Sequence, residues 1–165
     1  MARSALTLRA KVLTVSDGVA DGSREDRSGR ELAARLLDAG YDVVDHRVTP
    51  DGRDEVASAL RELTWGFAGL VVTTGGTGFG PRDLTPEGTR AVIDREAPGL
   101  AEAMRRVSDG EGRVFGMLSR GVCGAAGTAL VCNLPGSSNG AVECLEAILP
   151  AVPHALELLA GERPH

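Results

Sequence analysis

The residues best suited to chemistry gather in one segment, from Leu70 to Glu87. It begins with an apolar, β-branched run, continues through four glycines and the pair Arg82-Asp83, and ends in Thr85-Pro86-Glu87. Threonine is a good N-cap and proline fits the first helical turn, so a helix is expected to begin there. A strand, a glycine-rich loop and a helix N-terminus together direct backbone N–H groups and the helix dipole at one point, which favours an anion such as phosphate. The residues expected to contact this ligand are Thr74, Gly75, Gly76, Thr77, Gly78 and Arg82.

Asp83 adds a second requirement, because its carboxylate would repel a bare phosphate placed beside it. A divalent cation between the two groups would remove that repulsion, so the segment predicts a phosphorylated ligand bound with Mg²⁺. The alternative is that the glycines only form a tight connection between a strand and a helix, although such a turn has no need of the Arg82-Asp83 pair. The glycine spacing fits neither the GxxxxGK(S/T) phosphate loop nor the GxGxxG fingerprint.

The elements that must position this segment alternate along the chain. Apolar runs predict strands, and leucines and valines spaced three and four residues apart predict helices between them. Strands that alternate with helices indicate an α/β fold, here a three-layer sandwich with a mostly parallel central sheet and helices on both faces. The predicted strands are Leu8–Val15, Tyr41–Val48, Leu70–Thr74 and Thr128–Asn133.

Local signals indicate where the helices begin and end. Ser28 is expected to cap the first long helix and Gly40 to stop it, whereas Asp51 is expected to open the next. A further helix is predicted from Pro86 through Ile93. The remaining helices are expected to follow Pro98, to end at Leu149 and to include Leu156–Leu159.

Polar residues follow the predicted strands, at the positions where a parallel sheet binds its ligands. The residues just past successive strand ends are Asp17, Asp51, Asp83 and Asn133, with Ser16 beside the first. Three carboxylates at one sheet edge are unfavourable together unless cations or positive dipoles offset their charge. Asp17 and Asp51 could instead be turn and N-cap residues, as aspartate often is. The convergence of all three carboxylates at the same edge favours a metal and phosphate site.

A second strand–turn–helix element begins at the strand predicted over 128–133. Its turn could hold another anionic group or the polar edge of a ring, or it could be only a Pro-Gly turn with a serine cap. Residues 107–127 are rich in glycine and predict only short extended pieces around Met117-Leu118-Ser119. Within them, Arg120 is a further candidate for a phosphate contact. The candidate binding residues of the second element are Asn133, Pro135, Gly136 and Ser137.

Composition narrows the classes of protein that remain. The 165 residues suit one domain, and a net charge of −5 without a basic run argues against nucleic-acid binding. The three cysteines form no CxxC pair, so buried thiols are expected rather than a metal site. Residues 1–6 hold too short an apolar run for a signal peptide, and no segment approaches the ~20 apolar residues of a membrane helix. The protein is therefore expected to be cytoplasmic, with no membrane partner.

Three motifs together resemble the Mog/MoaB-type molybdenum cofactor biosynthesis proteins, whose domain also occurs in plant Cnx and animal gephyrin. They are Thr73–Gly78, Pro81–Glu87 and Asn133–Ser137, supported by Val15–Asp17, Asp26–Gly29 and Pro153–Leu156. The resemblance covers about residues 8–161, so it implies a single molybdopterin-binding domain over 1–165. It also implies an α/β sandwich that assembles as a homotrimer and works with other proteins of the same biosynthesis.

The activity that the resemblance implies is molybdopterin adenylyltransfer, in which ATP and Mg²⁺ convert molybdopterin to its adenylylated form with loss of pyrophosphate. Asp83 and Asp51 match the functional acidic positions of the family and are the expected catalytic and Mg²⁺-linked residues. Ser16 and Asp17 lie in the matching first loop. Two alternatives stay open: a non-catalytic protein that carries molybdopterin, and an unrelated nucleotide or sugar-phosphate enzyme that uses the same sheet edge.

Overall fold

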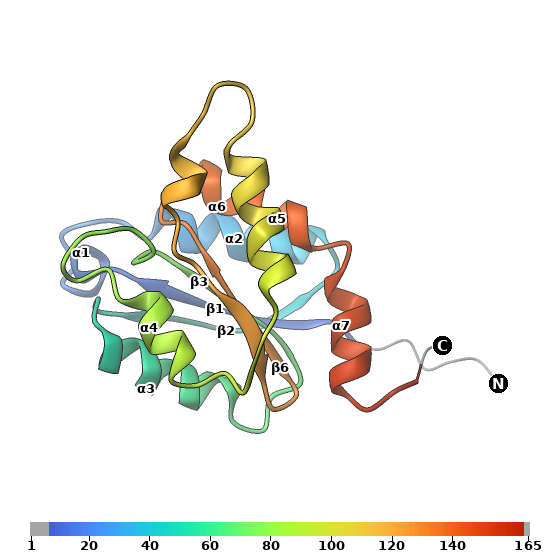
Figure 1. The fold of residues 1–165 in the computed structure, drawn as a ribbon. Coiled ribbons are helices and arrows are strands. Elements are labelled where there is room, and N and C mark those ends of the chain that lie inside the picture. Colours follow the sequence, from blue (N-terminus) through green and yellow to red (C-terminus); the bar gives the residue numbers. More distant parts are fainter. Residues whose placement is uncertain (1–6, 164–165) are drawn as a thin grey trace.

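The computed structural model describes residues 7–163, which build a six-stranded sheet in the order β2-β1-β3-β6-β5-β4 (Figure 1). Neighbouring strands are parallel from β2 through β6, whereas β5 and β4 join the sheet antiparallel. The predicted α/β fold with a mostly parallel sheet is thereby confirmed. The strands are β1 Arg9–Val15, β2 Asp42–Thr49, β3 Gly69–Thr74, β4 Arg95–Glu96, β5 Cys123–Ala126 and β6 Ala129–Leu134.

Seven α-helices and one 3₁₀ helix, η1, accompany the sheet within the described residues. They are α1 Asp17–Ala20, α2 Arg27–Asp38, α3 Arg53–Thr64, α4 Thr85–Arg90, α5 Pro98–Ser108, η1 Phe115–Leu118, α6 Ser138–Ile148 and α7 Val152–Leu159.

The helices form the two outer layers because the central strands are apolar on both faces. In β1, Val12 packs into the core that α2, α5, α6 and α7 cover, whereas Leu13 packs into the core that α3 covers. β3 divides in the same way, with Val72 on the first face and Val71 on the second. Burial on both faces explains why these strands read as continuous apolar runs rather than as alternating patterns.

Four parallel strands end at the same edge of the sheet, as the sequence predicted. Thr49 of β2 lies level with Val15 of β1, and Thr74 of β3 lies level with Leu134 of β6. The loops that follow these four positions therefore meet on one side of the molecule. The site is built there.

Two helix starts differ from expectation, because the predicted caps have other hydrogen-bond partners. α2 is capped by Asp26, whose carboxylate accepts from the Gly29 N–H at 3.1 Å, while the Ser28 hydroxyl lies 3.1 Å from the Thr74 hydroxyl. Thr85 is not the N-cap of α4 but its first residue, and its buried hydroxyl donates to the Gly75 carbonyl at 2.9 Å.

Two further boundaries were predicted incorrectly. α3 begins after Gly52, so Asp51 precedes the helix cap instead of forming it. α4 ends at Arg90, and Val92 and Ile93 lie beyond it, where they pack against the core on the α3 side. Val92 and Ile93 are partly buried without a further helical turn, so α4 can end at Arg90.

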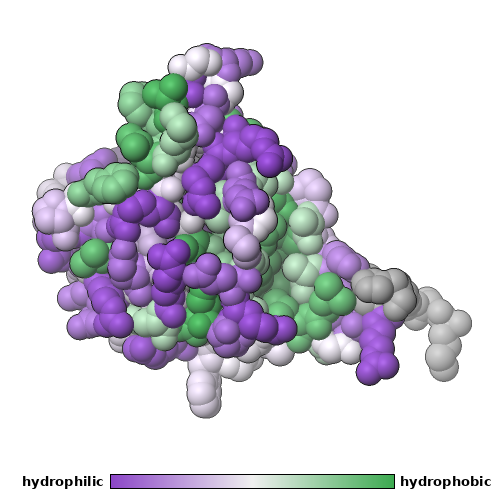
Figure 2. All heavy atoms as spheres, in the orientation of Figure 1, coloured by the Kyte–Doolittle hydropathy of each residue, from purple (hydrophilic) through white to green (hydrophobic). Residues whose placement is uncertain are grey.

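The segment predicted as short extended pieces around Met117 is instead η1, and the unpredicted strand β5 follows it. β5 pairs with β6. η1 lies outside the sheet and is joined to the end of α5, where the Met117 N–H donates to Asp109 at 3.1 Å. Figure 2 shows apolar surface gathered on this projecting part of the molecule, where Phe115 is 76% exposed.

The expectations from composition concern the cysteines, membrane helices and the N-terminal apolar run. Cys123, Cys132 and Cys144 are free and buried, as predicted. Among residues 7–163, no helix is long and apolar enough to cross a membrane. The N-terminal run examined for a signal peptide, residues 1–6, lies outside the described residues.

Candidate functional site

A cavity of about 510 Å³ opens beyond the carboxyl ends of β1, β3 and β6. Eight of the residues predicted from the sequence line it: Ser16, Asp51, Thr74, Gly75, Gly76, Asp83, Gly136 and Ser137. They come from both glycine-rich elements and from the loops after β1 and β2. The cavity also has lining residues that were not among the predicted site residues, although three of them lie in the supporting motifs Val15–Asp17 and Asp26–Gly29: Thr14, Val15, Val19, Arg24, Glu25, Arg27, Ser28 and Ser138.

The glycine loop after β3 is possible only with glycine at its first two positions. Gly75 and Gly76 have φ values of +102° and +68°, in the left-handed region that other residues rarely adopt. A Cβ at Gly75 would overlap the backbone carbonyl of Val15, and one at Gly76 would overlap the Thr85 hydroxyl. The bare backbone of this loop therefore packs tightly behind the cavity and faces a ligand inside it.

Asp17 and Asp51 bind each other reciprocally. The Asp17 N–H donates to the Asp51 carboxylate at 2.8 Å, and the Asp51 N–H donates to the Asp17 carboxylate at 3.2 Å. Arg82 donates twice to Asp17, at 2.6 and 3.0 Å, and once to the Asp51 carbonyl at 2.7 Å. Arg82 thus fixes the two acidic loops to each other, and neither it nor Asp17 lines the cavity.

The two aspartates differ in electrostatic environment. Burial raises the pKa of the Asp51 carboxyl, and the negative charges of Asp17 and Asp83 add to that increase. The hydrogen bonds from Arg82 hold the pKa of Asp17 below its usual range. A cation in the cavity would therefore offset the poorly solvated charge of Asp51.

Asp83 lines the same cavity from the glycine loop. One of its carboxylate oxygens accepts from the Gly80 N–H at 2.9 Å, which holds the side chain against its own loop. Arg82, the preceding residue, points to Asp17 instead. The two residues of the predicted Arg-Asp pair therefore have different roles. Arg82 joins the loops of Asp17 and Asp51, whereas Asp83 lines the cavity.

Arg120 lies outside the cavity lining and supports the glycine loop from behind. Its guanidinium donates to the carbonyls of Gly78, at 2.8 Å, and Asp83, and it forms an ion pair with Glu87. Its backbone N–H donates to the Thr77 carbonyl at 2.9 Å. These bonds connect Arg120 to the loop at several points, so Arg120 holds the glycine loop in place.

The other predicted binding residues outside the lining are also engaged internally. The buried Asn133 amide donates to the hydroxyls of Thr73 and Thr89, at 3.0 and 2.9 Å, and its oxygen accepts from the Val122 N–H. The Pro135 carbonyl accepts from the Thr74 hydroxyl at 2.8 Å. The predicted residues that do not line the cavity are Asp17, Thr77, Gly78, Arg82, Arg120, Asn133 and Pro135.

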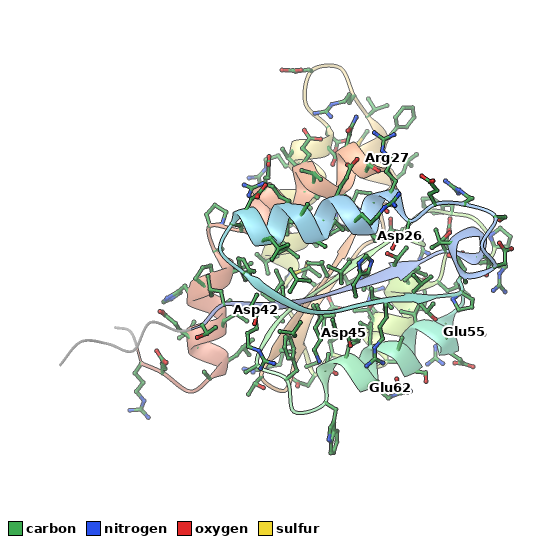
Figure 3. The ribbon with its side chains drawn as sticks, turned by 180° about the vertical axis from the view of Figure 1, so that it is seen from behind. Asp26, Arg27, Asp42, Asp45, Glu55 and Glu62 are labelled. Carbon is green, nitrogen blue, oxygen red and sulfur yellow. The ribbon has the colours of Figure 1, made fainter. Side chains whose placement is uncertain are left out.

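A polar network that the sequence analysis did not predict lies behind the side of the cavity opposite the glycine loop. The Thr14 hydroxyl donates to Asp26 at 2.9 Å, and His46 Nε2 lies 2.8 Å from the same carboxylate. Figure 3 shows Asp26 and Arg27 at the N-terminal end of α2. Asp26 thereby connects β1, β2 and α2. The supporting motif Asp26–Gly29 was the sequence signal for this part of the site, although no role was predicted for Asp26 itself.

The donor set of the cavity fits Mg²⁺. In the described part of the chain, no group of three or more His, Cys, Asp or Glu side chains could hold a metal ion by itself. Magnesium usually needs only one or two protein carboxylates, with water and substrate phosphates completing its shell. Asp51 and Asp83 supply two carboxylates to the same cavity, which meets that requirement once a phosphate ligand is present.

The fold and the cavity define an α/β protein whose glycine-lined cavity lies beyond the carboxyl ends of parallel strands, where such sheets bind their ligands. More specifically, residues 11–154 match the family described as "probable molybdopterin binding domain". The chain belongs to this family of molybdenum cofactor biosynthesis proteins, which confirms the resemblance seen in the motifs.

Relatives cover nearly the whole chain. It is 37% identical over 155 residues to the molybdenum cofactor synthesis protein cinnamon of Drosophila melanogaster, covering 92% of this chain but only 25% of cinnamon. It is also 37% identical over 169 residues to the molybdopterin adenylyltransferase of Haemophilus influenzae, covering 93% and 85% of the two chains. The crystal structure of the molybdopterin biosynthesis enzyme MoaB from Thermus thermophilus superposes with a TM-score of 0.87 at 43% identity, covering 94% and 98%.

Proposed function

We propose that the protein is a molybdopterin adenylyltransferase that transfers AMP from ATP to the terminal phosphate of molybdopterin. One observation carries the proposal: Asp51, Asp83 and both glycine-rich elements line a single cavity, in a chain whose family binds molybdopterin. The similarity to the Haemophilus influenzae adenylyltransferase over most of both chains supports the same activity.

The reaction needs charge neutralisation more than it needs a strong base. The phosphate of molybdopterin is an anion at neutral pH, and one of its oxygens attacks the α-phosphorus of ATP. A new P–O–P bond forms as the bond to the β-phosphate breaks, and pyrophosphate leaves with the electron pair. The backbone N–H groups of the glycine loop would orient the reacting phosphates, and holding two anions in line supplies much of the rate enhancement.

Asp51 and Asp83 would hold Mg²⁺, which supplies charge neutralisation of the phosphates when it is bound. The reciprocal bonds between Asp17 and Asp51 orient the Asp51 carboxylate. The Gly80 N–H does the same for Asp83. Both carboxylates are thereby set in place before any ligand arrives, which avoids an ordering cost during binding.

The decisive experiment mixes purified protein with molybdopterin, ATP and MgCl₂ and detects adenylylated molybdopterin and pyrophosphate by mass spectrometry. Asp83→Asn is expected to lower product formation by about 100-fold or more, because the reacting phosphates lose their positioning. Asp54→Asn, a change of the same chemistry on the exposed surface of α3, should leave the rate unaltered. Tight molybdopterin binding without product would instead identify a carrier of molybdopterin.

We further propose that the protein is a cytoplasmic, single-domain homotrimer that acts with other proteins of molybdenum cofactor biosynthesis. The exposed apolar residues Phe115, Met117 and Leu118 support contacts between copies, because monomers seldom leave such side chains clustered on their surface. Sedimentation equilibrium would measure the mass directly. Met117→Glu should weaken the assembly if this surface forms the contact.

A further inference from the structure

The cavity is lined by charged residues of both signs. Within the described residues, its lining includes three acidic residues, Glu25, Asp51 and Asp83, and two arginines, Arg24 and Arg27. The arginines that the sequence suggested for phosphate, Arg82 and Arg120, are engaged with protein acceptors outside it. A direct contact between a phosphate and an arginine of the lining therefore involves Arg24 or Arg27. These two residues belong to the segment from α1 to the start of α2, which we call the α1–α2 wall.

Arg24 is placed on this wall by its backbone and by a glycine. Its N–H donates to the Gly18 carbonyl at 3.0 Å, which folds the loop back onto α1. Its aliphatic stem lies across Gly18 so closely that a Cβ there would be 2.7 Å from Arg24 Cδ. Among residues 7–163, no carboxylate lies within ion-pair distance of this guanidinium. Its charge is therefore available to a ligand.

Arg27 stands on the same wall, at the first residue of α2 (Figure 3). Within residues 7–163 its ion pair joins Nε to Glu31 at 3.0 Å, and the side chain is 74% exposed. The two terminal nitrogens of its guanidinium are thus left to bind an anion. Two planar guanidinium groups three residues apart suit neighbouring phosphates, because each can donate two parallel hydrogen bonds to phosphate oxygens.

We propose that Arg24 and Arg27 form a polyphosphate subsite that binds the β- and γ-phosphates of ATP and then the pyrophosphate product. The assignment rests on the proposed adenylyltransfer and deepens it, because it places the leaving group against the α1–α2 wall. Both arginines are exposed. Pyrophosphate can therefore leave from this wall to solvent without passing the glycine loop. The α-phosphate then lies on the side of Asp51 and Asp83.

The test is calorimetric titration, with MgCl₂ present, of the full-length protein with ATP, with pyrophosphate and with AMP. Arg24→Gln and Arg27→Gln are each expected to weaken binding of ATP and pyrophosphate about tenfold, and the double variant about 100-fold. AMP lacks both distal phosphates, so its affinity should not change. Arg61→Gln removes one charge at an exposed position of α3 outside the lining and should change none of the three. Gly18→Ala displaces the Arg24 stem and should weaken pyrophosphate binding while the charge is retained.

Selective loss of ATP and pyrophosphate binding in the double variant supports the subsite. Equal losses for AMP, unchanged binding of all three ligands, or a wild-type protein that binds neither ATP nor pyrophosphate would overturn it. The product assay with molybdopterin separates this inference from the proposed function. If the double variant loses ATP and pyrophosphate binding selectively but the wild-type protein forms no adenylylated product, the polyphosphate subsite is supported. The proposed adenylyltransferase activity is then wrong.

Discussion

The two walls of the cavity are built in different ways. The glycine loop is clamped from behind, by the Thr85 hydroxyl, by Arg120 and by the Leu134 carbonyl, which accepts from the Gly75 N–H at 3.3 Å. The α1–α2 wall presents exposed arginines and is anchored mainly through Asp26. The difference separates two tasks: one wall fixes the position of reacting groups, and the other offers charge to a ligand that must enter and leave.

The largest effect on stability is expected in the clamped wall, from Gly75→Ala. The new Cβ would overlap the Val15 carbonyl, and alanine would be strained at a φ of +102°. We expect the free energy of unfolding to fall by about 3 kcal/mol. Urea denaturation followed by circular dichroism measures this change. Gly22→Ala, which also has a positive φ but meets no neighbour, provides the control for the backbone strain alone.

Arg120→Gln tests the clamp itself. Loss of the guanidinium leaves the half-buried Glu87 unpaired and frees the carbonyls of Gly78 and Asp83, so unfolding free energy should fall by about 2 kcal/mol. Arg24→Gln, the same change on the other wall, should stay within about 0.5 kcal/mol of the wild type. Equal destabilisation by the two variants would remove the distinction between the walls.

A smaller effect is expected at Asp26, the main anchor of the α1–α2 wall. Asp26→Ala removes the cap of α2 and the acceptor of Thr14, which should cost about 1.5 kcal/mol of unfolding free energy. Amide hydrogen exchange should show faster exchange at the Gly29 N–H, which donates to this carboxylate. Unchanged protection there would mean that the wall has an anchor other than Asp26.

The smallest effect lies away from both walls and gives a baseline for the others. Burial raises the pKa of Tyr41 to about 12, and its hydroxyl has no hydrogen-bond partner in the described part of the chain. The folded state therefore keeps a proton that the unfolded state loses from about pH 10 upward, so stability falls as the pH rises from 10 to 12. Tyr41→Phe should abolish this contribution and stabilise the protein by about 1 kcal/mol at neutral pH. Denaturation midpoints of both proteins from pH 7 to 11 provide the check.

The sequence was sufficient for the parts of the molecule that depend on local signals. The strands leading to Val15, Thr74 and Leu134 are apolar on both faces, and the parallel arrangement follows from the helices between them. The glycines mark a loop that other residues cannot adopt, and Asp51 and Asp83 line the cavity at the predicted sheet edge.

Side-chain partnership could not be predicted in the same way, because it depends on residues distant in sequence. Arg82 binds Asp17, 65 positions away, and Arg120 binds Glu87, 33 positions away. Arg24 reaches the cavity only because its loop folds back onto Gly18. An arginine beside a glycine loop therefore has at least two possible partners, a ligand or the loop itself, and the residue type does not distinguish them.

The reciprocal bonds between Asp17 and Asp51 have a consequence for how this sequence can vary. Each residue supplies the acceptor that the other's backbone needs, so a substitution at either position also leaves an N–H of its neighbour unpaired. The two positions are therefore expected to vary together. A change at one position alone gives a less stable protein, whereas a matching change at the other restores the missing acceptor. Among distant descendants of this fold, aspartate, asparagine or serine at one position should accompany a matching acceptor at the other.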